Sequence, residues 1–148
     1  MNAYRYLEQV QEKEIYWQRK IAELKRLEML ETDITAPLRP DPVQTSGNND
    51  KMGTLIVTRL DFEKEVVNKA EADYLRHRKR VIKTLEKVKD INFQQYKILH
   101  MRYIEYLTLK KISTKECYSY QRIKEIHRNG VKNVQNILDF QKVHTKTY

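Results

Sequence analysis

The distribution of proline and glycine restricts the fold of this chain more than any other feature of its sequence. The 148 residues contain only three prolines and three glycines, and five of these six residues lie between Thr32 and Gly53. Proline and glycine interrupt helices, so this stretch is not expected to be helical throughout. The flanking sequences are rich in Lys, Glu, Leu and Ile, which favour helices. The sequence therefore predicts an all-α fold.

Apolar residues recur every three or four positions on both sides of this Pro-rich loop, which we place at residues 32–53. The rhythm predicts one amphipathic helix over residues 3–31 and a second over residues 54–89. The apolar residues of each helix form a stripe along one face. Neither helix can bury this stripe alone, so we expect a coiled-coil-like helical hairpin or pairing across a homodimer. The stripes consist of Leu7, Val10, Trp17, Ile21, Leu24, Leu27 and Leu30, and of Leu60, Val67, Ala70, Tyr74, His77, Val81, Leu85 and Val88.

Three shorter helices are predicted after this hairpin. Asn92 is a predicted N-cap for a helix over residues 93–106, a short helix follows at 108–115, and Ser119 caps a last helix that continues through Leu138. Gly130 within that helix costs about 1 kcal/mol relative to Ala, which suggests a bend or a close helix contact. We therefore predict a hairpin domain at 1–89, a second domain at 90–142 and a tail at 143–148, with fraying from Gln141.

The last two helices have the apolar spacing of a helix-turn-helix, in which two helices cross over a tight turn. Glu116 is a misfit at an inward position, and Cys117 stands where Gly is usual because the turn residue is left-handed. The ordinary alternative is a helical hairpin without a DNA role. The fitting inward positions hold Ile112, Tyr118, Ile123 and Ile126, with Ser113 at the crowded position.

Basic charge is concentrated around this motif. The chain has a net charge of +9, and residues 108–148 carry 9 basic and 3 acidic side chains, against 7 and 9 in residues 1–50. Such a surface suits the phosphates of double-stranded DNA, although a solvated basic surface is the plain alternative. A second basic cluster, Arg76–Arg80, is expected to spread around its helix as a collar, more consistent with solvated surface than with a phosphate contact.

Side chains in the first turns of a recognition helix reach base edges in the major groove, whereas phosphate contacts only position the protein. Gln matches adenine and Arg matches guanine in bidentate fashion. The predicted base-reading residues are Tyr120, Gln121, Lys124 and Glu125. The predicted phosphate contacts are Lys110, Lys111, Ser119, Arg122, Arg128 and Lys132.

Sequence patterns of enzymes are lacking, so we expect a protein that is not an enzyme, with no cofactor, metal or small-molecule substrate. The four histidines have no metal-ligand spacing with each other or with Cys117, and there is no Gly-rich phosphate loop. No apolar run approaches the roughly 20 residues needed to cross a bilayer. A single cysteine and a charged N-terminal sequence predict a cytoplasmic protein without membrane contact.

Residues 95–138 resemble region four of bacterial sigma factors. The similarity lies in Leu99–Tyr103, in Leu107–Ser113, in the turn Cys117-Tyr118-Ser119, and in Gln121–Ile126, which is similar to the sigma pattern Glu-Arg-Ile-Arg-Gln-Ile. The resemblance implies a DNA-binding helix-turn-helix. Glu116 and Cys117 depart from the family pattern at the turn.

The Pro-rich loop is similar to a signature of small sigma-like proteins of Gram-positive phages and prophages, in Ile34–Pro37, Asp41–Gly47 and Asp50–Met52. The whole chain thus resembles phage late-gene transcription regulators of the ArpU/RinA type. This implies a DNA-binding activator that acts with host RNA polymerase. The alternative is a packaging subunit resembling small terminases, which also join a helix-turn-helix to oligomerising helices.

Overall fold

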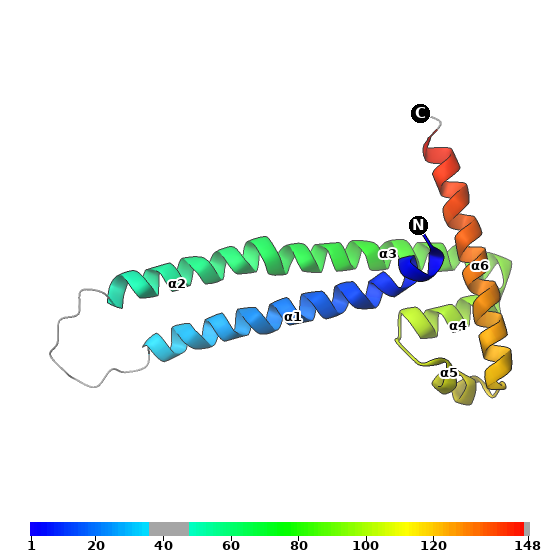
Figure 1. The fold of residues 1–148 in the computed structure, drawn as a ribbon, viewed down its shortest axis with the longest axis horizontal. Coiled ribbons are helices and arrows are strands. Elements are labelled where there is room, and N and C mark those ends of the chain that lie inside the picture. Colours follow the sequence, from blue (N-terminus) through cyan, green and yellow to red (C-terminus); the bar gives the residue numbers. More distant parts are fainter. Residues whose placement is uncertain (36–47, 147–148) are drawn as a thin grey trace. The chain divides into compact units, whose positions relative to one another are not determined.

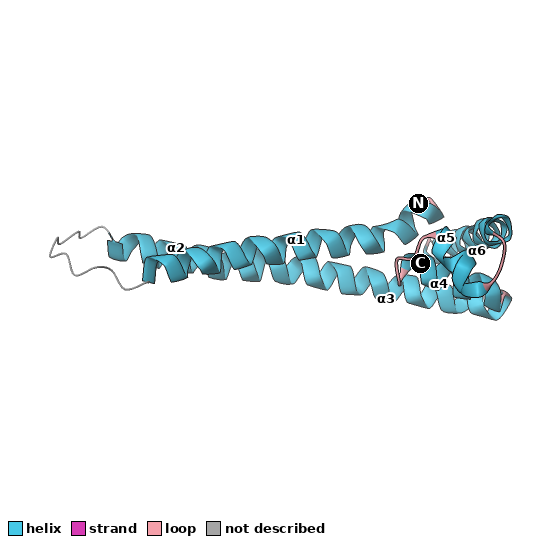
Figure 2. Cartoon of the chain, turned by 90° about the horizontal axis from the view of Figure 1, so that it is seen from below, coloured by secondary structure: helices cyan, strands magenta, loops and turns pink. Residues whose placement is uncertain are grey.

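The computed structural model describes residues 1–35 and 48–146, and these are almost entirely helical (Figure 1). Figure 2 shows helices joined by loops, with no strand in the described part of the chain, so the predicted all-α class is confirmed. The elements are α1 (Ala3–Thr35), α2 (Asn48–Phe62), the π-helix η1 (Glu63–Val67), α3 (Asn68–Ile91), α4 (Phe93–Tyr103), α5 (Leu109–Glu116) and α6 (Tyr120–Thr145).

The helices on both sides of the Pro-rich loop extend further into it than predicted. The first helix continues to Thr35, and the second begins at Asn48 instead of Thr54. Gly53, which we took as the end of the loop, lies inside α2 with open space around it. A glycine lowers helix propensity by about 1 kcal/mol but does not by itself end a helix. The remaining residues of the predicted loop, 36–47, lie outside the described residues.

A π-helix interrupts the second predicted helix, which we had expected to be continuous. The five residues of η1 separate α2 from α3. Hydrogen bonding from residue i to i+5 takes more residues per turn, so the apolar stripe before η1 is rotated relative to the stripe after it. Val67 is buried as predicted, but Leu60 is 49% exposed, and the prediction that Leu60 belongs to the buried stripe was wrong.

Two of the last three helices begin at the predicted caps, Asn92 and Ser119. Asn92 accepts a hydrogen bond from the backbone N–H of Gln95 at 3.1 Å, so this N-cap is confirmed. The following helix ends at Tyr103, not at residue 106, because the chain turns there: Tyr106 has a positive φ of 60° and Leu107 N–H donates to the Met101 carbonyl. The connection from α4 to α5 is therefore a short loop.

Backbone proximity divides the chain into two units, and the division differs from the predicted domains. The first unit comprises Met1–Lys13 and Tyr74–Tyr148, and the second unit comprises Glu14–Asp73. The start of α1 belongs to the first unit because side chains of α3 hold it. The Tyr6 hydroxyl is hydrogen bonded to Thr84 Oγ1 at 3.1 Å, and the His77 Nε2 atom is hydrogen bonded to the Tyr6 carbonyl at 2.8 Å.

The first unit contains nearly all of the buried apolar side chains among the described residues. Leu7 and Val10 of α1 are fully buried, as are Val81, Leu85 and Val88 of α3, Leu99 of α4 and Val134 of α6. The N-terminal residues also contact α6, since Ala3 N–H donates to Gln135 Oε1 at 2.8 Å. The predicted buried stripe is thus confirmed for its members in this unit.

The second unit buries much less. Among its described residues only Val67 and Ala70 are buried, and Met29, Leu30 and Val57 are exposed. Arg59 Nε donates to Glu31 Oε1 at 2.8 Å, which links α2 to α1. These two helices are therefore joined by a well-formed polar link, and their described residues in the second unit form little apolar core.

The last helix is longer than predicted. Fraying was expected from Gln141 and a tail from residue 143, but α6 continues to Thr145. No proline or glycine follows Gly130 in this helix, and Lys142 and His144 in the last turn suit the negative end of the helix dipole. At Gly130 the predicted close contact is confirmed, because an added Cβ would lie 3.0 Å from Cδ1 of the buried Leu99.

Substitution of the two helical glycines should distinguish the effect of side-chain packing on stability from the effect of helix propensity. Gly53→Ala should stabilise α2 by up to about 1 kcal/mol because open space surrounds it. Gly130→Val should destabilise the first unit by about 1–3 kcal/mol because Leu99 is enclosed and overpacking forces it to move. Urea unfolding followed by circular dichroism measures both. Equal responses at the two positions would contradict a close contact between α6 and α4.

Candidate nucleic-acid interface

The junction between α5 and α6 is fixed by capping side chains at both helix starts. Thr108 accepts a hydrogen bond from Lys111 N–H at 3.2 Å, and Ser119 accepts one from Arg122 N–H at 3.2 Å. Each bond satisfies a backbone donor that a helix leaves free at its N-terminus. Ser119 is confirmed as the N-cap of α6, and its hydroxyl accepts that bond while its O–H remains able to donate.

Cys117 ends α5 in the left-handed conformation, with φ 58° and ψ 32°. This is the backbone geometry expected at the turn, adopted without glycine. Ser113 strengthens the turn, because its Oγ donates to the Tyr118 carbonyl at 2.6 Å. The small side chain expected at position 113 is therefore also a hydrogen-bond donor that closes the turn.

An apolar cluster holds α4, α5 and α6 together beneath this turn. Ile112 and Ile123 are fully buried, and Ile126 is nearly so, as predicted for inward positions. Leu107 and Leu109 pack against the cluster from the α4–α5 loop and the start of α5. The whole cluster consists of Ile98, Met101, Ile112, Ile123 and Ile126.

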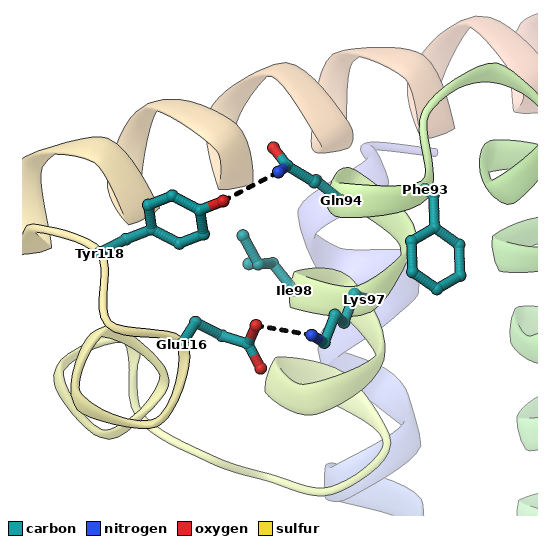
Figure 3. Close-up of a pocket in the computed structure, with 6 residues that line it drawn as sticks. All are labelled: Phe93, Gln94, Lys97, Ile98, Glu116 and Tyr118. Atoms are coloured by element: carbon teal, nitrogen blue, oxygen red, sulfur yellow. Dashed lines mark hydrogen bonds and ion pairs between the residues drawn. The ribbon is translucent and has the colours of Figure 1, made fainter.

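Glu116, the misfit of the predicted motif, forms an ion pair with Lys97 of α4. The Glu116 Oε2 atom lies 2.6 Å from Lys97 Nζ, and only 14% of the Glu116 side chain is exposed (Figure 3). A buried carboxylate is tolerable only when it is paired, and Lys97 supplies that partner. Sequence spacing alone did not reveal this pair, because its members lie on different helices.

Tyr118 was expected to point inward, but it is 40% exposed. Its hydroxyl accepts a hydrogen bond from Gln94 Nε2 at 3.0 Å, which places the ring over α4 instead of in the core (Figure 3). Tyr118 and Phe93 line opposite sides of a cavity of about 190 Å³, and Gln94, Lys97, Ile98 and Glu116 complete its lining. The prediction of Tyr118 as an inward residue was therefore wrong.

Three of the four predicted base-reading residues lie together on one exposed face of α6. Gln121, Lys124 and Glu125 surround a surface hollow of about 330 Å³ together with Arg128. Arg128 was predicted as a phosphate contact, but its position one turn beyond Lys124 places it on the same exposed face as the three predicted base-reading residues. Tyr120 lies beside this group, with Lys124 Nζ 4.3 Å from the centroid of its ring.

The predicted phosphate contacts are spread over two helices. Lys110 and Lys111 are exposed in the first turn of α5, and Lys132 is exposed one turn beyond Arg128 on α6. Arg122 is exposed, but its Nη1 atom lies 3.1 Å from Glu125 Oε2, so a phosphate would compete with this carboxylate. Lys110, Lys111 and Lys132 form no ion pair with a described residue. The geometry therefore favours these three lysines among the predicted phosphate contacts.

Sequence reasoning missed a polar contact behind the candidate face. Tyr103 of α4 is hydrogen bonded through its hydroxyl to His127 Nε2 at 2.8 Å, and the two rings stack with centroids 5.7 Å apart. Burial, and then the nearby charge of Arg102, lowers the pKa of His127 from its ordinary 6.5 to about 4. Burial raises the pKa of Tyr103. His127 is therefore neutral at pH 7, and its hydrogen bond with Tyr103 links α6 to α4.

The described part of the chain lacks two features of other functional classes. Residues 1–35 and 48–146 hold no group of three or more His, Cys, Asp or Glu side chains arranged for a metal ion. None of their helices has an apolar segment long enough to span a lipid bilayer. Comparison of the chain with protein-family models, curated proteins and solved structures gave no match.

His127 should make the stability of the first unit depend on pH. Its folded pKa of about 4 lies below the ordinary 6.5. Between these values the unfolded chain binds more protons, so stability is fully present above pH 6.5 and falls as the pH is lowered toward 4. The loss should be on the order of 2 kcal/mol, allowing for partial exposure of the ring.

His127→Gln retains a hydrogen-bonding group for Tyr103 but cannot titrate in this range. Urea unfolding between pH 4 and pH 7 should give a flatter profile for this variant than for the wild type. His144→Gln is the matched control, because His144 is exposed in the last turn of α6. Identical profiles for all three proteins would show that His127 is not held neutral in the folded state.

Proposed function

We propose that the chain is a sequence-specific DNA-binding transcriptional regulator that places α6 in the major groove. The observation that carries this proposal is the α5–α6 junction. A left-handed residue at Cys117 and a cap at Ser119 join two helices over a shared apolar cluster, and the first turns of α6 expose polar side chains. These are the features that a helix-turn-helix needs to present a recognition helix.

The exposed face of α6 has the chemistry for reading bases. Gln121 can bond adenine through its amide, and Arg128 can bond guanine through its guanidinium. Glu125 can accept a hydrogen bond from cytosine, while its contact with Arg122 holds its carboxylate in place. Lys124 and Tyr120 complete this group. Lys110, Lys111 and Lys132 supply phosphate contacts beside it.

The distribution of charge supports DNA as the partner. The first unit, which contains α5 and α6, carries 20 basic and 8 acidic side chains, a net charge of +12. The second unit carries 9 basic and 12 acidic side chains, a net charge of −3. Attraction to the phosphate backbone therefore acts on the unit that presents the candidate recognition helix.

The regulatory part of the proposal rests on the resemblance of residues 95–138 to sigma region four and of the whole chain to late-gene regulators of phages. In this role the protein binds upstream of late operons and contacts host RNA polymerase. Transcription from such an operon with purified polymerase, with and without the protein, tests this part separately from DNA binding.

Gln121→Ala should weaken binding to the preferred duplex by about 1–3 kcal/mol and leave binding to scrambled duplex nearly unchanged. Lys132→Ala should weaken binding to both duplexes alike, because phosphate contacts carry no sequence information. The preferred duplex comes from selection out of a random library, and affinities follow from fluorescence anisotropy at fixed salt concentration.

Asn136→Ala is the matched control, since Asn136 is exposed on α6 one turn beyond Lys132, away from the first turns that carry the predicted base-reading residues. It should bind like the wild type. A wild-type protein that enriches no sequence would contradict the proposed function, and equal losses for Gln121→Ala on both duplexes would contradict its base-reading role.

A further inference from the structure

Four basic residues form a straight row on α3. Arg76, Arg80, Lys83 and Lys87 are separated by four, three and four residues. At 3.6 residues per turn they lie within about 60° of the helix circumference, and the row is about 17 Å long. We call these four residues the α3 stripe. All of α3 from Tyr74 onward belongs to the first unit, together with α5 and α6.

The α3 stripe differs from the collar that the sequence suggested for residues 76–80. His77 is turned inward and buried, where it is hydrogen bonded to the Tyr6 carbonyl, and Arg78 is half-buried. His77 was predicted in the buried stripe, and the exposed basic residues of the cluster are Arg76, Lys79 and Arg80. Only Arg76 and Arg80 of that cluster join the stripe, and the helical register adds Lys83 and Lys87.

The four side chains are exposed, and the ion pairs among the described residues include none of them. The acidic residues of α3 near the row, Asp73, Glu86 and Asp90, are displaced from its centre by about 50°, 90° and 50°. Four like charges a turn apart repel one another, and an anionic partner relieves this repulsion.

We propose that the α3 stripe is a second binding site for the phosphate backbone of the same DNA duplex that α6 reads. A single strand of duplex DNA presents one phosphate per about 3.4 Å of helix axis, so a row of about 17 Å spans several phosphates. The site is nonspecific, because phosphates carry no sequence information. It lengthens the contact with DNA beyond the motif that α6 selects. This inference rests on the proposed function.

The stripe fits a duplex better than a lipid surface. A helix that binds a membrane surface exposes an apolar face beside its basic face. The apolar face of α3 is occupied inside the first unit, where Val81, Leu85 and Val88 are fully buried. The stripe can therefore attract lipid headgroups but has no apolar face to insert among them, whereas phosphates along a duplex need only the row of charges.

The test uses the full chain with Arg76, Arg80, Lys83 and Lys87 all replaced by Gln. The control chain carries Lys25→Gln, Arg26→Gln, Lys51→Gln and Lys64→Gln, which remove the same charge from exposed positions of the second unit. Affinity for the selected duplex and for a scrambled duplex is measured from 50 to 300 mM salt. Circular dichroism confirms that both variants keep the wild-type helix content.

The stripe variant should lower the slope of log affinity against log salt by about 2–4 on both duplexes, because each lost phosphate contact removes about 0.9. Its selected motif should be that of the wild type, and its footprint should be shorter. The control chain should keep most of the wild-type slope. Vesicles with anionic headgroups should bind the wild type more weakly than the duplex does, because the stripe has no apolar face to insert among the lipids.

Three results would overturn the proposal. If the slope of log affinity against log salt falls equally in the stripe variant and the control chain, DNA affinity depends only on the total charge of the protein. If the stripe variant keeps the wild-type slope while Gln121→Ala loses the motif, α6 reads DNA without the stripe. If the wild type binds vesicles through the stripe but the stripe variant binds DNA normally, the ligand is a lipid surface. Failure of the wild type to bind any duplex would overturn the proposed function as well.

Discussion

Burial of Ile98, Met101, Ile112, Ile123 and Ile126 determines where the candidate interface lies on the protein. Each fully buried side chain of this size contributes about 1.5–3 kcal/mol, so together they outweigh any single polar contact nearby. Because α5 has only eight residues, it is too short to be stable alone and depends on this cluster. The exposed face of α6 is fixed indirectly: once Ile123 and Ile126 are turned inward, Gln121, Lys124 and Arg128 must point outward.

Local signals in the sequence predicted the parts of the structure that depend on neighbouring residues. The caps at Asn92 and Ser119, the left-handed turn at Cys117 and the inward isoleucines follow from short-range spacing, and all are observed. The exposed face of α6 follows from the same spacing. Contacts between distant residues could not be predicted in this way. The Lys97–Glu116 pair and the Tyr103–His127 bond depend on how helices meet, which periodicity does not encode.

Errors in the predicted boundaries also have physical causes. Gly53 was taken as a helix end, although an exposed glycine only lowers propensity and neighbouring residues continue the helix. The π-helix η1 shifted the register of the apolar stripe at Leu60, and no residue type in Glu63–Val67 indicates such a shift. Likewise, the sequence placed His77 in the buried stripe but did not show that its hydrogen-bond partner would be the Tyr6 carbonyl.

The small core of the second unit has a consequence for how the chain opens. Among its described residues only Val67 and Ala70 are buried, whereas the first unit encloses fully buried side chains from α1, α3, α4, α5 and α6. Segments with few buried contacts open at a lower free energy than the core. Amide protons of the second unit should therefore exchange with solvent while those around Ile112 and Ile123 remain protected. Local melting of Glu14–Asp73 can then occur without loss of the helices that carry the basic surface.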